Sequence, residues 1–220
     1  MKKIIPSIEP KFSQKLDKRL LDAEPNLALE TARISAQHEF IALLQHVNYI
    51  LGDLKNGKKA DLISLQSALN KTQNYVDLID LGKDKDVKWK QVLSLMHILD
   101  HAHRLRERCA KEEYRAKIVQ QFPDLHKVHR ATINNNIKII TALNSKKFSK
   151  ARKYAENYEK KISKFMKHYR NMTVEEMVKD EIDLPSGTSK LEAARWLVRV
   201  NHHIARISYY MEQVVLETAK

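Results

Sequence analysis

Glycine and cysteine are both scarce in this sequence. The chain of 220 residues has four glycines, and neither of the glycine-rich phosphate-binding patterns, G-x-G-x-x-G or G-x-x-x-x-G-K-[ST], occurs. The single cysteine, Cys109, excludes an internal disulfide and a zinc cage of cysteines, which fits a reducing compartment. Because Cys109 stands late in a helical pattern, we predict a buried, packed side chain rather than a nucleophile.

Long apolar runs and a secretory leader are also missing. No stretch of about 18 apolar residues is present to span a bilayer. The beginning, MKKIIPSIEP, lacks the apolar segment of a secretory signal. Positive charge, by contrast, is in excess, because 40 Lys and Arg against 27 Asp and Glu give a net charge of +13. Such a charge suits nucleic acid, an anionic membrane surface or an acidic protein as the partner.

Apolar residues recur at alternating steps of three and four through most of the chain, which is typical of packed helices. No segment has the pattern of a strand. Gly57 is expected to end the first helix, and Pro123 to stand in the first turn of the fourth. Capping boxes at Thr173–Glu176 and Ser189–Glu192 predict a short extra helix and the start of the last helix. The long helices are predicted over roughly 26–54, 60–81, 86–115, 124–144, 147–171 and 190–218.

The two halves of the chain resemble each other. A shift of 102 residues places LMHILDHAHRL, residues 95–105, over LVRVNHHIARI, residues 197–207. Three positions are identical and the apolar positions coincide, which favours a duplicated unit. We therefore predict an all-α fold of two tandem three-helix bundles with antiparallel, up-and-down helices. The predicted boundaries are a connector at 1–25, a first bundle at 26–118 and a second at 119–220, joined near Phe122 and Pro123.

The third helix of each predicted bundle resembles a helix of the PhoU family of phosphate regulators. That family reads approximately A-R-x-L-E-R-I-G-D-H-A, where this chain has AARWLVRVNHHIA. Residues 16–33, LDKRLLDAEPNLALETAR, are similar to a connector, L-D-x-R-L-L-x-x-P-x-L-A-L-E-x-A-R, of bacterial sodium/phosphate cotransporter family proteins. In those proteins the connector leads from the membrane part into a cytosolic PhoU-like domain. The likeness covers nearly the whole chain from Leu16, and the connector is its more specific part.

The resemblance implies metal clusters held by an E-x-x-x-D motif in each half. Two carboxylates four residues apart share a helix face and can converge on a cation. In this chain the glutamate positions hold Met96 and Val198, and the aspartate positions hold Asp100 and His202. One carboxylate of four remains, so we expect no metal and no other cofactor.

Histidines are the remaining candidates for metal ligands. His97 and His101 stand four residues apart, a spacing that can hold a transition metal, but two ligands are too few. With Asp100 and His202 they form a weak candidate set, and a solvated or hydrogen-bonded helix edge is the preferred interpretation. Four further acids could add ligands but are expected to be plain surface: Asp77, Asp80, Glu156 and Glu159.

No catalytic grouping emerges from the sequence. No serine or cysteine lies in a nucleophile elbow or beside a plausible base, and no paired acids flank an evident cleft. We therefore predict that the protein is not an enzyme.

Basic residues concentrate in the fifth predicted helix. Residues 146–170 hold ten Lys or Arg and two Glu, a net charge of +8. Three interpretations stay open: a solvated face, contact with anionic lipid at the cytosolic leaflet, and nucleic acid, for which no reading motif or stacking platform is present. Six lysines opposite the apolar side form what we name the lysine stripe: Lys146, Lys150, Lys153, Lys160, Lys164 and Lys167.

The resemblance implies a regulatory or assembly domain on the cytoplasmic side of the inner membrane, associated with sodium-dependent phosphate transport. Its partner would be a membrane-embedded transporter part outside this chain. A freestanding PhoU-like phosphate-signalling regulator that binds a partner protein is the alternative, and a basic helical nucleic-acid-binding protein is the third reading. The sequence leaves open the transported ion, the signal sensed and the oligomeric state, a homo-oligomer included.

Overall fold

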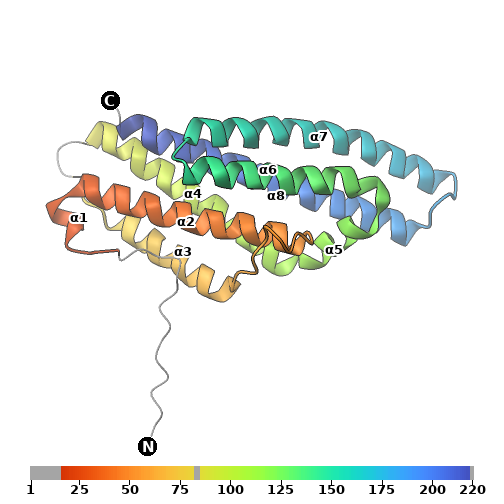
Figure 1. The fold of residues 1–220 in the computed structure, drawn as a ribbon, viewed down its shortest axis with the longest axis horizontal. Helices are drawn as coiled ribbons and strands as arrows, with labels where there is room; N and C mark the ends of the chain where they lie inside the picture. The colour runs from red at the N-terminus through yellow and green to blue at the C-terminus, as the bar shows by residue number, and fades with distance from the viewer. Residues whose placement is uncertain (1–15, 82–84, 219–220) are drawn as a thin grey trace, which may run out of the picture.

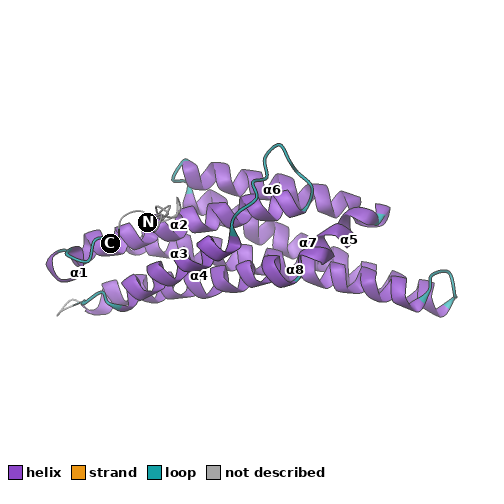
Figure 2. Cartoon of the chain, turned by 90° about the horizontal axis from the view of Figure 1, so that it is seen from below, coloured by secondary structure: helices purple, strands orange, loops and turns teal. Residues whose placement is uncertain are grey.

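The computed structural model describes residues 16–81 and 85–218. Every regular element in these ranges is helical, as predicted, and most helices run along the long axis of an elongated molecule (Figures 1 and 2). Residues 1–15 of the predicted connector lie outside the described residues. The elements are α1 (Leu20–Ala23), α2 (Pro25–Ile50), α3 (Leu62–Asp77), α4 (Lys85–Lys111), α5 (Glu113–Gln121), the 3₁₀ helix η1 (Pro123–Leu125), α6 (His126–Asn144), α7 (Phe148–Val178) and α8 (Leu184–Thr218).

The ends of α2 follow from proline and glycine. Pro25 stands in the first turn, where its missing N–H removes no helical hydrogen bond. The helix ends at Ile50 rather than near residue 54, and Gly52 follows with a φ of 87°, a left-handed conformation that suits glycine. The predicted breaker, Gly57, lies in the next loop. A Cβ there would come within 2.4 Å of the Tyr49 backbone nitrogen, so Gly57 permits the loop to approach the last turn of α2.

Neither predicted capping box starts a helix. Helix α7 continues through Thr173, which is buried and donates its hydroxyl to the Tyr169 carbonyl oxygen at 3.0 Å. Such a bond to the preceding turn belongs inside a helix, whereas a cap must lie at its free end. Helix α8 begins at Leu184 rather than near residue 190. Just before this start, Asp183 accepts a hydrogen bond from the Ser186 backbone N–H at 2.8 Å. An aspartate in this position satisfies an N–H group of the first turn.

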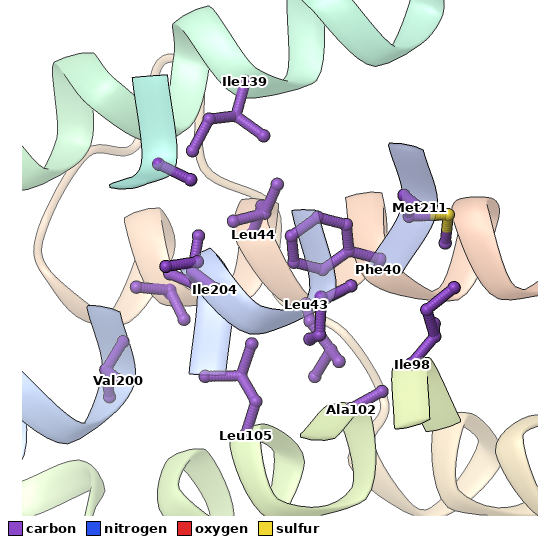
Figure 3. Close-up of a cluster of buried hydrophobic side chains, with 14 of the residues drawn as sticks. Phe40, Leu43, Leu44, Ile98, Ala102, Leu105, Ile139, Val200, Ile204 and Met211 are labelled. Atoms are coloured by element: carbon purple, nitrogen blue, oxygen red, sulfur yellow. The ribbon is translucent and has the colours of Figure 1, made fainter. Parts of the chain in front are cut away.

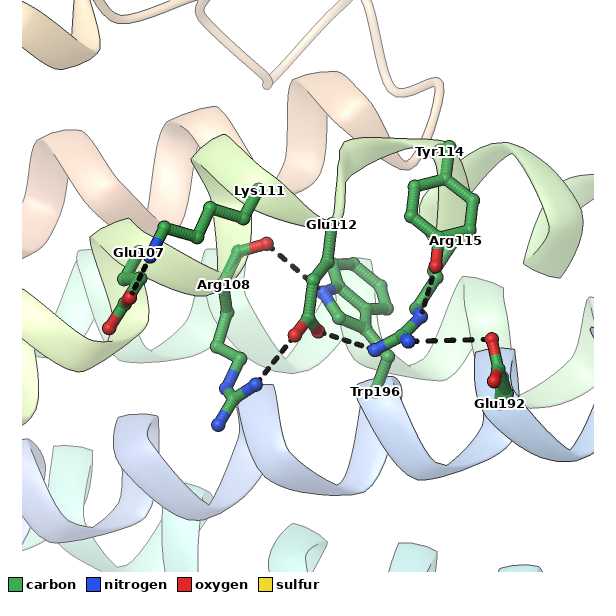
Figure 4. Close-up of polar contacts among 8 residues, drawn as sticks. All are labelled: Glu107, Arg108, Lys111, Glu112, Tyr114, Arg115, Glu192 and Trp196. Carbon is green, nitrogen blue, oxygen red and sulfur yellow. Dashed lines mark hydrogen bonds and ion pairs between the residues drawn. The ribbon is translucent and has the colours of Figure 1, made fainter.

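The helix predicted over residues 86–115 is divided between α4 and α5 at Glu112, whose φ of −125° is not helical. Figure 4 shows the Glu112 carboxylate between two arginines, Arg108 at 2.6 Å and Arg115 at 2.8 Å. Arg115 also reaches Glu192 of α8 at 3.4 Å, so this glutamate of the predicted capping box forms an ion pair instead. The Trp196 indole N–H donates to the Arg108 carbonyl oxygen at 3.3 Å. These contacts hold the junction between α4 and α5 against α8.

Two groups of helices pack side by side. Helices α2, α3 and α4 contact one another, and α7 contacts both α6 and α8. Helix α8 also packs against α4, which joins the two groups, while α5 contacts α8 and leads through η1 into α6. In Figures 1 and 2 the hairpin of α7 and α8 extends beyond the other helices at one end of the molecule.

The apolar core runs through both groups as one cluster. Figure 3 shows its centre, where side chains from α2, α4, α6 and α8 point into a shared space. Ala102 of α4 and Ile204 of α8, which are equivalent under the shift between the two halves, are each 1% exposed. The apolar sides predicted for these two helices are therefore confirmed. Other members are Phe40, Leu43, Ile98, Leu105, Ile139, Val200 and Met211.

Candidate functional site

The repeated helices α4 and α8 meet at a pair of histidines. The Nδ1 atoms of His101 and His203 lie 3.1 Å apart, and their ring centroids are 5.4 Å apart. These residues are separated by 102 positions, the same shift that aligns the two halves of the sequence. Equivalent positions of the two aligned segments thus meet in this contact.

Both of these histidines are neutral at physiological pH. Burial lowers the pKa of His101 to about 4. Burial, reinforced by the neighbouring His101 and His202 rings, also lowers the pKa of His203 to about 4. With both rings uncharged, the Nδ1–H of one histidine donates a hydrogen bond, and the unprotonated Nδ1 of the other histidine accepts it. Neither Nδ1 atom is then available to act as a base on an outside substrate.

Tyr210 of α8 extends this cluster. His97 stacks on Tyr210 with ring centroids 4.5 Å apart, and His101 lies 6.2 Å from the same ring. The Arg206 guanidinium donates to the Tyr210 hydroxyl at 2.7 Å. We name His97, His101, His203 and Tyr210 the histidine seam, because they line the contact between α4 and α8.

The other two predicted ligand candidates have partners outside the seam. His202 Nδ1 lies 2.8 Å from the Glu159 carboxylate of α7. Asp100 accepts a hydrogen bond from Arg104 at 3.1 Å, one turn further along α4. Among residues 16–81 and 85–218, no three His, Cys, Asp or Glu side chains gather in a way that could hold a metal ion. The expectation of a metal-free protein stays a prediction, which elemental analysis of the purified chain tests.

The remaining acids and motif positions are spread over the surface. Asp77 is exposed on α3 and accepts a hydrogen bond from Gln73 at 2.7 Å, and Asp80 is exposed in the loop that follows. Glu156 pairs with Arg152 at 2.8 Å. The two positions where the resemblance implies glutamate do not share one environment: Met96 is exposed and Val198 is half-buried.

Cys109 is fully buried in α4, which confirms the predicted packing role. Burial raises the pKa of its thiol to about 12, so the thiolate that a nucleophile requires does not form near neutral pH. The chain's single cysteine is therefore part of the core.

Two seam residues were not predicted as site residues. His203 aligned with His101 under the shift between the halves, and this alignment was the signal that could have placed the two rings together. Tyr210 has no such signal, because it aligns with Arg108 and its ring reaches the seam only through the crossing of α4 and α8.

Five members of the lysine stripe lie on one exposed side of α7, and Lys146 stands in the loop before that helix. All six lysines are exposed. Lys150 lies 5.8 Å from the centre of the Tyr154 ring. Over the same ranges, no helix combines the length and the apolar character that crossing a bilayer requires. The stripe is thus a row of exposed positive charge.

Comparisons with protein-family models, with curated proteins and with solved structures find no match to this chain. Inference about function therefore rests on the residues and contacts of the chain itself.

Proposed function

We propose that this protein is a non-catalytic, PhoU-like regulatory or assembly domain associated with sodium-dependent phosphate transport. The proposal includes two three-helix bundles, residues 26–118 and 119–220, after a connector at residues 1–25. The observation that carries it is the contact between His101 and His203, equivalent positions of the repeated helices, at 3.1 Å. Helices α2, α3 and α4 pack together and α7 packs with α6 and α8, while extensive packing of α4 on α8 joins the two groups.

Two observations support a role without catalysis. Burial keeps the Cys109 thiol protonated, with a pKa of about 12. The Nδ1 atoms of His101 and His203 form a hydrogen bond with each other. A histidine that activates a nucleophile would instead bond to a serine or cysteine side chain. The single cysteine and the Nδ1 atoms of the two seam histidines are thus engaged within the fold.

The lysine stripe supports a position on the cytoplasmic side of the inner membrane. Each lysine near an anionic leaflet contributes about 1 kcal/mol, and the attraction fades beyond a Debye length of about 8 Å. Because the stripe is exposed on one face of α7, it can hold a tethered domain close to lipid. The partner in this setting is the membrane-embedded transporter part.

The test is sodium-dependent uptake of radiolabelled phosphate by cells of the source organism with and without this protein. Loss of the chain is expected to change uptake, and returning the gene on a plasmid is expected to reverse the change. As a matched control, a double variant with Asp100→Ala and His202→Ala should restore uptake as well as the wild type, because the proposed role needs no metal. Equal uptake in the presence and absence of the chain would contradict the proposal.

The second candidate is a freestanding PhoU-like phosphate-signalling regulator, which the net charge of +13 favours through an acidic partner protein. Fractionation of cells that carry a tagged chain separates the two candidates. We expect the chain in the membrane fraction. Recovery only from the soluble fraction, together with one acidic protein, would favour the alternative. Nucleic-acid binding has the least support, and it would show a steep loss of affinity with salt.

A further inference from the structure

A groove lies between the beginning of α7 and the last turns of α8, two segments that Figure 1 shows side by side. Its volume is about 790 Å³. Ligand sites in proteins range over roughly 300–1,000 Å³, so the groove is large enough for a small organic ligand. Three members of the lysine stripe line it: Lys146, Lys150 and Lys153.

The floor of the groove is apolar. The lining includes Phe148 and Tyr154 of α7 and Val215 and Leu216 of α8, which we name the apolar floor. Leu216 is 49% exposed, so part of this floor is open to solvent. A ligand with a hydrocarbon portion would remove this surface from water, which is favourable in proportion to the apolar area buried.

The rim of the groove is positively charged. Lys147 joins the three stripe lysines there, and all four are exposed. The one acid in the described lining, Glu212, is 7% exposed and pairs with Arg152 at 2.8 Å. Its charge is therefore neutralised from within the protein, and the lysines remain for an anionic ligand.

The loop before α7 holds two of these lysines in fixed positions. Lys147 donates its backbone N–H to the Ala142 carbonyl oxygen at 2.8 Å, and Lys146 donates to that of Leu143 at 3.0 Å. These bonds form the usual closure at the end of a helix, in which the residue after the cap has a left-handed backbone. Lys146 occupies that place with a φ of 55°, where glycine is the favoured residue.

We propose that this groove binds an anionic phospholipid, with the phosphate of the headgroup among the rim lysines and the upper part of one acyl chain on the apolar floor. Free phosphate would use the lysines but leave the floor in water. A nucleic acid would need open aromatic faces for several successive bases, whereas Tyr154 is the one half-buried ring in the described lining and Phe148 is 8% exposed. The inference takes its membrane setting from the proposed function and adds a discrete lipid site to it.

The experiment is calorimetric titration of the whole chain with dihexanoyl-phosphatidylglycerol below its micelle concentration. Dihexanoyl-phosphatidylcholine and glycerol phosphate serve as parallel probes, because the first lacks net charge and the second lacks the acyl chains. The expected result is saturable binding of phosphatidylglycerol and at least about tenfold weaker binding of both other probes. Equal binding of glycerol phosphate would show a free-anion site and overturn the lipid proposal.

Two triple variants provide the matched comparison. Lys146, Lys150 and Lys153 have the same spacing in the sequence as Lys160, Lys164 and Lys167, and each set carries three charges. Substituting the first set with Gln should weaken phosphatidylglycerol binding at least about tenfold, whereas the same change in the second set should alter it less than about threefold. Equal losses in the two variants would mean diffuse attraction along α7 and would reject the groove.

Two single variants separate binding from folding. Leu216→Ser keeps every charge and should weaken binding about fivefold, through loss of the apolar floor. Lys146→Gly should raise the unfolding temperature, because it relieves the left-handed backbone, and yet weaken lipid binding by a few fold. Wild-type affinity in both variants would overturn the proposal. If phosphate uptake still depends on the chain in that case, the lipid site fails while the proposed function stands. The failure of the lipid site and the failure of the proposed function are therefore distinguishable.

Discussion

Glu39 is an acidic residue buried in the core of this protein. It lies in the middle of α2 with no exposed surface, and the Thr72 hydroxyl of α3 donates a hydrogen bond to its carboxyl group at 2.7 Å. Its second carboxyl oxygen, Oε2, has no hydrogen-bond partner among the residues that the structure describes. Burial raises the pKa of Glu39 from 4.5 to about 8, so the folded protein holds this side chain uncharged at neutral pH.

Glu39→Gln is predicted to change how stability depends on pH. Between pH 4.5 and about 8 the unfolded chain has released a proton that the folded chain retains. The free energy of unfolding of the wild type should therefore fall as pH rises through this window, by at most about 1.4 kcal/mol per pH unit from this group. Urea unfolding at pH 5 and pH 8 measures this. The free energy of unfolding of the variant, relative to that of the wild type, should be larger at pH 8 than at pH 5. An unchanged difference between the two proteins would mean that Glu39 is ionised when folded.

Ile204 and His202 stand two residues apart on α8 but face different surroundings. Ile204 is 1% exposed in the core, so Ile204→Ala should leave a cavity and cost roughly 2–5 kcal/mol. The His202 side chain is 49% exposed, so His202→Ala should cost less than about 1 kcal/mol. Urea denaturation of the two single variants measures both. A larger loss for His202→Ala would show that its contact with Glu159 belongs to a structural network.

At the scale of elements, the contact between α4 and α8 has the most distinctive chemistry. His101 and His203 hold their hydrogen bond while uncharged, because burial lowers the pKa of each to about 4. In the unfolded chain histidine titrates near 6.5. Protons therefore bind the unfolded state first as pH falls, and the folded contact loses stability in acid.

A double variant with His101→Gln and His203→Gln is predicted to be less sensitive to acid. In the wild type, the contribution of the two histidines is complete above pH 6.5 and is lost between pH 6.5 and about 4, at up to about 1.4 kcal/mol per pH unit for each ring. Gln retains a donor and an acceptor but does not titrate. Thermal unfolding at pH 7 and pH 5 should show a smaller shift in the double variant. His38→Gln, on the exposed side of α2, should keep the wild-type shift, and an equal shift in all three proteins would refute the assignment.

At the scale of the whole molecule, the two halves share one core. Apolar residues of α2, α3, α4, α6, α7 and α8 belong to the same buried cluster. The apolar side of α8 faces α4, and Trp196 is fully buried and bonded to the Arg108 carbonyl oxygen of the first half. Separating the halves would expose this surface of α8 to water.

Unfolding is therefore predicted to be a single cooperative transition. Helical content from circular dichroism and the fluorescence of Trp196 should change at the same urea concentration, because the indole lies between the halves. Trp89→Phe removes the second, exposed tryptophan and leaves Trp196 as the sole reporter. Two separate transitions in the dichroism signal would show that the halves fold independently.

The amino-acid sequence by itself determined the helical class and the buried side of the long helices. Leu105 and Ile204 are buried as predicted, because a repeat of three and four residues places such side chains on one face of a helix, whatever lies opposite. Cys109 was correctly assigned to the core for the same reason. The equivalence of His101 and His203 was also visible, as an alignment between two segments.

Only the tertiary structure decided where helices end and which side chains meet. Glu112 breaks α4 from α5 while it pairs with Arg108 and Arg115, and Thr173 stays within α7 because it is buried there. These outcomes depend on ion pairs and packing that local sequence patterns do not contain. The seam likewise exists because α4 and α8 cross where His101 faces His203. Periodicity specifies the face of each helix, whereas the crossing of two helices is set by how their side chains interlock.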